Sequence, residues 1–264
     1  MFKPMNTATA KETHRHKALV YAFHGWGKTT QAAHMQRTYG KTFIISGESG
    51  LKSVSDANID FLPFSSWDGE NDPEKGIYSF RGIVKMMSSK EFKDAGYECI
   101  FIDSLTELAD RCIEHWQKIH EDNKNAFAIW GDYGSSMLGA LKWVRDLPYH
   151  VVVTSLAKEA KDDNGDQDYW PFIAGNAVQK QVGGIFDHVF CGVRVTDGDR
   201  TSPVVSRYIV TDEVRGWHGK TRDPKKRLKP VEKTADISEL FQKLDMPESD
   251  YEAKVKAAKT GETK

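Results

Sequence analysis

The chain has 264 residues, and its 37 lysines and arginines almost balance its 38 aspartates and glutamates, leaving a net charge of −1. This balance excludes a protein that coats nucleic acid through its overall charge, although a local basic patch stays open. Apolar residues make up 39% of the chain and 21 glycines add to them, which is typical of a globular protein and excludes global disorder.

No apolar run approaches the roughly 18 residues that a membrane span needs. Residues 1–16 are polar and contain no apolar signal segment, so we expect a flexible N-terminal arm, no membrane association and a cytoplasmic protein. The three cysteines are widely spaced and form no CxxC pair, which favours reduced thiols over a disulfide frame or a zinc site.

The predicted elements alternate between strands and helices. In chain order they are a strand at 18–23, a helix at 28–39, strands at 42–46 and 59–64, a helix at 77–87, a strand at 99–102, helices at 105–119 and 137–147, and a strand at 151–154. This alternation predicts an α/β fold with a mostly parallel twisted sheet flanked by helices. Such sheets bind ligands beyond the C-terminal ends of their strands.

The second half of the chain is less regular. Residues 156–184 contain several glycines and acids and are expected to form a long functional or mobile loop. Late antiparallel strands are expected at 189–195 and 207–211. We therefore expect the main domain at residues 17–233, followed by a short helix and a disordered tail within residues 234–264.

A candidate phosphate-binding loop lies between the first strand and the first helix. The segment AFHGWGKT matches the last three positions of the P-loop pattern GxxxxGK[ST], with Ala22 at the first glycine position. Glycines let the backbone amides curl around phosphates, the lysine reaches the β- and γ-phosphates, and the threonine hydroxyl binds Mg²⁺. The expected binding residues are His24, Gly25, Trp26, Gly27, Lys28, Thr29 and Thr30.

Three alternatives accompany this prediction. A second Gly-Lys-Thr triplet, at residues 219–221, precedes Arg-Asp-Pro, which stops a helix rather than starting one. The segment could also be a plain β-turn-α connection with a surface lysine. Gly25 and Gly27 begin a GxGxxG dinucleotide fingerprint, with Glu48 about 20 residues further on, but Thr30 replaces its third glycine.

Two acids follow predicted strands. Asp103 ends the apolar strand at 99–102, which is the Walker B arrangement for a carboxylate that supports Mg²⁺. Asp103 or Ser104 could instead cap the next helix. Glu48 follows the strand at 42–46, where a carboxylate can polarise an attacking water, or can simply be an acid between turn glycines.

The order of these features resembles the RecA-like ATPases, and more closely the phage-encoded P-loop ATPases of the AAA_24 type, which include single-strand annealing and recombination proteins. The matching segments are 22–29, 43–48, 100–104 and 151–155. The resemblance implies a RecA-like core, ATP and Mg²⁺ as cofactors, ATP hydrolysis, and a homo-oligomeric ring or filament. It also implies a role in phage-type DNA recombination.

The resemblance also implies residue roles. Lys28 and Glu48 would be catalytic, Glu48 by activating water, and Thr154 and Ser155 would end a core strand as polar sensors. Lys220 and Arg222 resemble the KxR finger that reaches the γ-phosphate of a neighbouring subunit, although a solvated basic turn is nearly as good an interpretation. Hydrolysis would then be slow without DNA or oligomerisation.

Single-stranded DNA is the expected partner. The loop at 156–184 offers aromatic rings for stacking and amines for phosphates, but its aspartates would repel a DNA backbone. The candidates are Lys158, Lys161, Tyr169, Trp170, Phe172, Lys180 and Gln181, with a second basic patch at Lys225, Lys226, Arg227, Lys229 and Lys233. Two other functions stay open: a nucleotide-gated DNA-binding module with little turnover, and a P-loop kinase for a small molecule.

Overall fold

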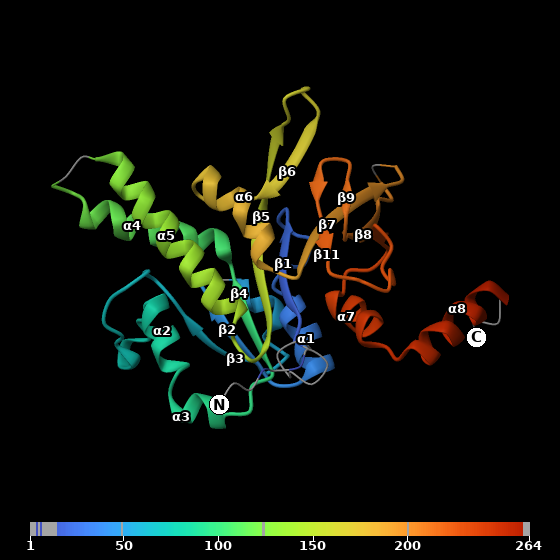
Figure 1. Cartoon of the computed structure of the whole chain (residues 1–264), viewed down its shortest axis with the longest axis horizontal. Coiled ribbons are helices and arrows are strands. Elements are labelled where there is room, and N and C mark those ends of the chain that lie inside the picture. Colours follow the sequence, from blue (N-terminus) through green and yellow to red (C-terminus); the bar gives the residue numbers. More distant parts are fainter. Residues whose placement is uncertain are drawn as a thin grey trace.

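The computed structural model describes Pro4, Asn6 and residues 15–48, 50–122, 125–199 and 201–260 (Figure 1). The predicted flexible arm at 1–16 therefore lies almost wholly outside the described residues. Its last two residues are held in place. Arg15 pairs with Glu98 at 2.6 Å, and the His16 ring stacks on Phe241 with ring centroids 4.2 Å apart.

Strands and helices alternate along the first half of the chain, as the sequence predicts. The strands are β1 (Lys17–Ala22), β2 (Thr42–Ser46), β3 (Asp60–Pro63), β4 (Cys99–Asp103), β5 (His150–Lys161), β6 (Gln167–Pro171), β7 (His188–Asp197), β8 (Val204–Val210), β9 (Glu213–Val214), β10 (Trp217–His218), β11 (Lys220–Thr221) and β12 (Val231–Glu232). The helices are α1 (Gln31–Tyr39), α2 (Phe80–Met86), α3 (Lys90–Asp94), α4 (Leu105–Ile119), α5 (Ala126–Arg145), α6 (Asn176–Ile185), α7 (Ile237–Asp245) and α8 (Glu248–Thr260). Short 3₁₀ turns lie at Gly50–Val54 and Pro73–Lys75.

The central sheet has the strand order β3-β2-β4-β5-β1-β7-β8-β12. The pairs from β3 to β7 are parallel, and β8, β11 and β12 add antiparallel pairs at the other side. This confirms the predicted α/β fold with late antiparallel strands. The register places Ala22 beside Leu156 and Gly192, and Ser46 beside Asp103, so the strand ends singled out in the sequence share one edge of the sheet.

Helices cover both faces of the sheet, and each face has its own apolar core. The larger core packs β-strand residues against α2, α4, α5 and α6. The smaller core lies under α1 and α7, where Ile237, Leu240 and Phe241 are fully buried. Helix α7 packs against this face of the sheet. The domain boundary predicted between residues 233 and 234 lies between α7 and the sheet that α7 covers.

The predicted loop at 156–184 is a hairpin followed by a helix. Strand β5 continues to Lys161, and β6 pairs with it from Gln167 to Pro171. The Asp162 carboxylate accepts backbone N–H bonds from Asn164 and Asp166, both at 2.9 Å, and Gly165 has a φ of +86°. Residues 162–166, whose acids and glycine suggested a long loop, therefore form a tight turn between β5 and β6. Asp, Asn and Gly are common in such turns.

Two helices also differ from the expectation. Helix α5 begins at Ala126 rather than Met137, capped by the Asn125 side chain, which accepts from the N–H of Phe127 at 3.1 Å. The sequence predicts a disordered tail over the last dozen residues, but those of them that the structure describes belong to α8, which is rich in alanine, lysine and glutamate, all good helix formers. Within the described ranges, no helix has the length and apolarity that crossing a bilayer requires.

Buried histidines begin the two strands that flank β1, at the N-terminal edge of the sheet. His150 starts β5 and His188 starts β7, and the backbone N–H of His16 donates to His150 Nδ1 at 3.2 Å. His16 Nε2 lies 3.0 Å from the carboxylate of Asp245 at the end of α7. Burial lowers the pKa of both His150 and His188 to about 3. The folded protein therefore keeps these two rings neutral where an exposed histidine is charged.

This difference predicts acid sensitivity. Below pH 6.5 the unfolded histidines bind protons that the folded ones refuse until about pH 3, so stability is complete above pH 7 and is lost as the pH falls. Replacing His188→Gln should reduce the slope of unfolding free energy between pH 4 and 6 by about 1.4 kcal/mol per pH unit. Urea titrations at several pH values measure it. His115→Gln, on α4 outside this cluster, is the control, and equal slopes for the wild type and His188→Gln would contradict the prediction.

Candidate nucleotide-binding site

The segment between β1 and α1 has the backbone of a phosphate-binding loop. Gly25 has a φ of +75° and Gly27 a φ of +109°, a region that side chains with a Cβ rarely enter. The amides of residues 25–30 donate no hydrogen bond to any described residue. Such amides at the start of a helix form an anion-binding concavity. Ala22, at the first glycine position of the pattern, is a buried strand residue without a positive φ, so alanine fits there without backbone strain.

Trp26 ties this loop to the sheet rather than filling it. Its ring is 2% exposed, and its Nε1–H donates to the carbonyl of Tyr208 on β8 at 3.3 Å. The ring lies against Gly192 on β7, where a Cβ would be 2.4 Å from the indole. The largest side chain of the loop is therefore held in the core and does not fill the loop.

Lys28 is buried, with its side chain folded back across the loop. Its Nζ donates to the carbonyl of Ala22 at 3.2 Å, which keeps it near the amides. Burial lowers the pKa of Lys28, and the carboxylates of Glu48 and Asp103 partly raise it again. Lys28 is thus a cation surrounded by the residues that the sequence singles out.

Asp103 connects the end of β4 to β5 and to the loop that follows β1. It is fully buried at the end of β4, and its carboxylate accepts hydroxyl bonds from Thr29 at 2.6 Å and from Thr154 at 2.5 Å. Burial raises the pKa of Asp103, and these two hydroxyl bonds lower it in part. The N-cap of α4 is Ser104, whose side chain accepts from the N–H of Glu107, so Asp103 does not fill the alternative capping role.

A hydroxyl and a carboxylate oxygen at this distance are the hard donors that Mg²⁺ prefers. In the part of the chain that the structure describes, no group of three or more histidines, cysteines or acids gathers around a possible metal position. Two protein oxygens suit Mg²⁺ because this ion keeps several waters and takes further ligands from phosphates. Thr29 and Asp103 therefore fit the role of Mg²⁺ ligands.

Glu48 lies beside this group. The hydroxyl of Ser104 donates to Glu48 Oε1, and the hydroxyl of Ser46 donates to the Glu48 carbonyl at 2.7 Å. Gly47 donates its N–H to the carbonyl of Asp103 at 2.7 Å, and a Cβ at this glycine would collide with Phe64. The turn after β2 thus needs glycine to bring the Glu48 carboxylate next to β4.

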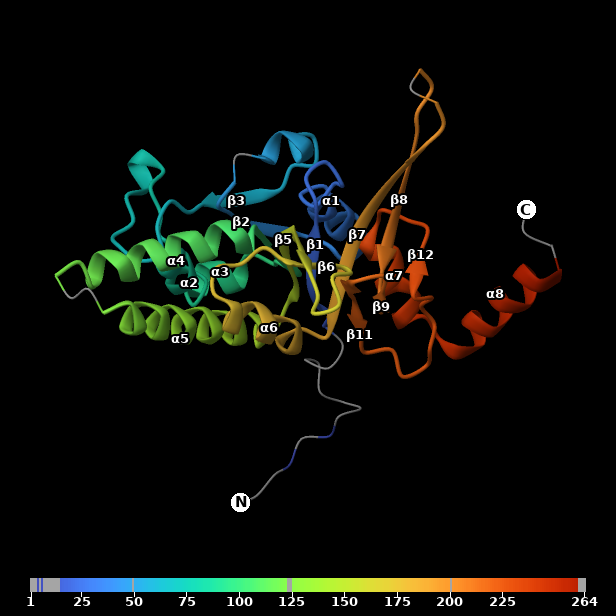
Figure 2. The same ribbon diagram turned by 90° about the horizontal axis from the view of Figure 1, so that it is seen from above.

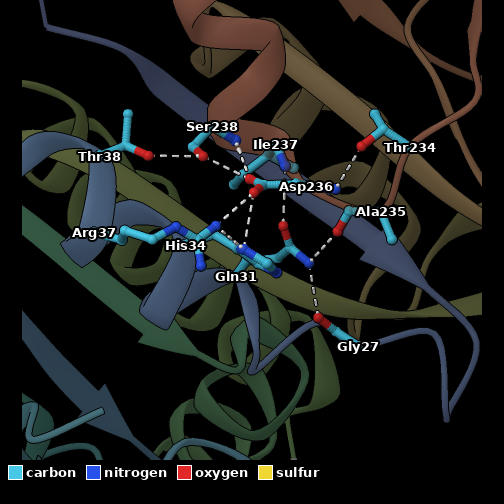
Figure 3. Close-up of polar contacts among 10 residues, drawn as sticks. All are labelled: Gly27, Gln31, His34, Arg37, Thr38, Thr234, Ala235, Asp236, Ile237 and Ser238. Carbon is cyan, nitrogen blue, oxygen red and sulfur yellow. Dashed lines mark hydrogen bonds and ion pairs between the residues drawn. The ribbon is translucent and has the colours of Figure 1, made fainter.

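A polar network that the sequence does not reveal supports the loop from α7 (Figure 3). The side chain of Gln31, 1% exposed, donates to the carbonyls of Gly27 at 2.9 Å and Ala235 at 2.8 Å, and accepts from the N–H of Ile237 at 3.0 Å. Asp236 adds ion pairs with His34 and Arg37 on α1. No local pattern could predict these contacts, because the partners lie about two hundred residues apart in the chain.

The two finger candidates lie elsewhere. Strand β11 pairs with the beginning of β7, with Lys220 opposite Val189, whereas the loop follows the edge at Ala22 and Gly192. At about 3.3 Å per residue, Lys220 lies about 10 Å back from that edge. Its Nζ donates to the Gly183 carbonyl at 2.8 Å, and Arg222 pairs with Asp187 at 2.9 Å. The structure therefore does not bring Lys220 and Arg222 to the loop of their own chain.

The DNA-binding candidates are divided by the fold. Tyr169 stacks on Trp217 and Trp170 on His218, with ring centroids 4.4 and 3.9 Å apart, so their faces are partly covered. Phe172 is 47% exposed, with Lys158 Nζ 5.9 Å from its ring centroid. In the second basic patch, Arg227 is buried and donates to carbonyls at the end of α7, so it does not belong to a basic surface.

A parallel sheet of this order, with a Gly-Lys-Thr loop after β1 and a buried aspartate ending β4, defines a RecA-like P-loop ATPase fold. The chain belongs to the AAA_24 family of AAA domains, whose model matches residues 14–222. It is thus an AAA-type P-loop ATPase domain.

Similar solved structures include the flagellar accessory protein FlaH from Methanocaldococcus jannaschii, at 10% identity and a TM-score of 0.36, covering 74% of this chain and 78% of that one. Another is an ATPase from the type III secretion system of pathogenic bacteria, at 14% identity and a TM-score of 0.41, covering 67% of this chain and 51% of that one. At these values the likeness does not extend to activity. No curated protein matches the chain.

The packing of Trp26 against Gly192 predicts that Gly192→Ala destabilises the protein. In Gly192→Ala the new methyl would meet the indole at 2.4 Å and the Ala22 methyl at 2.8 Å, so the ring must move. We expect a loss of about 1–3 kcal/mol in unfolding free energy, measured by urea denaturation. Gly131→Ala, inside α5 with no atom within 4 Å of the new methyl, is the control and should be neutral or stabilising by up to about 1 kcal/mol. Equal stabilities of Gly192→Ala and the wild type would contradict this packing.

Proposed function

We propose that this domain is a Mg²⁺-dependent ATPase that acts on single-stranded DNA in recombination or annealing of the phage type. The ATPase part rests on one observation, the row of unpaired amides at residues 25–30 beside Lys28. Amides and an ammonium group converging on one concave surface suit a chain of phosphates. Membership of the AAA domain family supports nucleotide binding at this loop.

The residues around the loop have different roles in the proposed reaction. Lys28 binds the β- and γ-phosphates, while Thr29 and Asp103 hold Mg²⁺, which supplies charge neutralisation on the phosphates when bound. The buried carboxylate of Asp103 is held in one orientation by Thr29 and Thr154. Thr154, on the adjacent strand, therefore positions the metal-holding group.

Glu48 orients the attacking water. Its carboxylate lies at the end of β2, one strand beyond Asp103, and Ser104 fixes one oxygen by donating to it. The other oxygen is left to accept a hydrogen bond from water, as a general base or positioning group requires. Glu48 thus acts on water rather than on the metal.

Lys220 and Arg222 serve a neighbouring subunit. Both lie away from the loop of their own chain, and Arg222 is 67% exposed, so it can reach another molecule. A cation that one subunit supplies to its neighbour stabilises the transition state only when the subunits form a homo-oligomer, as a ring or a filament. Hydrolysis by the isolated subunit is accordingly slow.

Two substitutions test the ATPase. Lys28→Ala should abolish ATP turnover, because the phosphates lose their principal cation. Glu48→Gln should retain ATP binding but lower turnover by at least about a hundred-fold, because the amide cannot accept a proton. Turnover is measured by phosphate release and binding by calorimetry. Full turnover in Lys28→Ala would refute the site, and full turnover in Glu48→Gln would assign the water to another residue.

The hairpin of β5 and β6 supports the DNA-binding part of the proposal. It grows directly from β5, whose Thr154 contacts Asp103, so a strand of DNA on the hairpin would lie on the same element as the metal site. The exposed ring of Phe172 offers a surface for a base, and Lys158 offers a charge for a phosphate. Strand β5 would therefore connect DNA bound on the hairpin to the ATPase site.

A DNA-dependent rate tests this part. Single-stranded DNA should stimulate ATP turnover at low salt, and the stimulation should fade as salt rises, because phosphate contacts release counterions. Phe172→Ala should weaken DNA binding by about ten-fold through lost stacking. Ile119→Ala, which removes another exposed apolar side chain on α4, is the control. A rate that is independent of DNA at every salt concentration would contradict the proposal.

A further inference from the structure

Two arginines lie directly opposite each other on β7 and β8. The antiparallel register pairs Arg194 with Arg207, so their side chains project from the same face of the hairpin, and both are exposed. Neither side chain forms a hydrogen bond or an ion pair with any residue that the structure describes. Two like charges facing each other across a strand pair destabilise it. Folding alone gives no reason for this arrangement.

The pair lies beside the phosphate-binding loop. Strand β7 runs next to β1, and Gly192, which pairs with Ala22, is two residues before Arg194 and on the same face. Arg194 Nη1 lies 3.5 Å from the position that a Cβ at residue 25 would occupy, and Gly25 has no side chain to fill that place. Figure 2 shows this hairpin projecting from the body of the molecule.

The electrostatics on this side of the loop favour an anion. The loop presents the positive ends of its unpaired amides, and Arg194 adds a full positive charge next to them. The acids of the site, Glu48 and Asp103, lie on the other side of β1, at the ends of β2 and β4. A cavity of about 340 Å³ lies beside Arg194, and its wall also contains His24 and the aromatic rings of Phe23, Trp26, Tyr169 and Trp217.

We propose that Arg194 and Arg207 clamp the phosphate chain of the nucleoside triphosphate bound by the loop of the same subunit. This inference rests on the proposed ATP binding. Guanidinium groups match phosphate oxygens in a two-pronged geometry, and a bound polyphosphate removes the repulsion between the two side chains. The pair thus acts in cis, unlike Lys220 and Arg222 at the far end of β7.

Binding of a non-hydrolysable ATP analogue to the full chain, measured by calorimetry with Mg²⁺, tests the clamp. Arg194→Gln should weaken binding by about ten-fold to a hundred-fold and Arg207→Gln by about ten-fold, because each loses charge-assisted hydrogen bonds. Arg194→Lys, which keeps the charge without the fork, should fall between Arg194→Gln and the wild type. The control is Arg145→Gln at the end of α5, an exposed arginine paired with Asp146, which should bind as the wild type does.

Stability provides a second readout. Without nucleotide, Arg194→Gln and Arg207→Gln should melt at the wild-type temperature or about 1–2 °C higher, because one of two repelling charges is gone. A supporting or structural role for either arginine would instead lower the melting temperature in parallel with the affinity, and that result overturns the clamp.

The remaining outcomes separate this inference from the ATPase itself. If the wild type binds the analogue and Lys28→Ala does not, but Arg194→Gln binds at full strength, only the clamp is overturned. If the wild type fails to bind, the clamp and the proposed function fall together. If the arginine variants keep the affinity for the analogue but bind single-stranded DNA more weakly without nucleotide, the pair serves a nucleic-acid backbone and the clamp is overturned.

Discussion

The structure depends on a short stretch of backbone whose amides have no hydrogen-bond acceptor among the residues that the structure describes. The N–H groups of residues 25–30 donate to no described residue, and the glycines at 25 and 27 allow the positive φ angles of this stretch. Each neighbouring element fixes one side of the stretch. Trp26 anchors it to β7 and β8, Gln31 connects it to α7, and Thr29 joins it to β4 through Asp103. The loop is therefore held rigid by groups that leave its amides free.

Charge is distributed unevenly around this loop. Carboxylates gather on the side of β2 and β4, and unpaired arginines gather on the side of β7 and β8. A polyphosphate carrying a divalent cation near one end has the complementary asymmetry. In the binding mode that we propose, the acids attract the metal-bearing end and the exposed guanidinium groups attract the bare phosphates. The two halves of the sheet thus orient a ligand of this kind in one direction.

The sequence predicts the centre of the molecule better than its periphery. Thr29 and Asp103 are 74 residues apart, yet their meeting follows from two parallel strands that end at one edge. The β5–β6 hairpin is hidden because Lys158, Glu159 and Lys161 lack the apolar alternation of a strand. The early start of α5 is hidden by glycines that weaken a helical pattern. Contacts such as that of Gln31 with Ala235 leave no local signal at all.

The network between α1 and α7 has a consequence for where this enzyme can be cut. The family match stops at residue 222, before α7, and a fragment trimmed to that limit would lose two of the three backbone partners of the Gln31 side chain. The amide of Gln31 would then lack these hydrogen-bond partners, and the apolar residues that Phe241 covers would be exposed to solvent. A fragment that keeps the loop supported therefore has to extend beyond the matched segment and include α7, together with Glu248, which pairs with the buried Arg227.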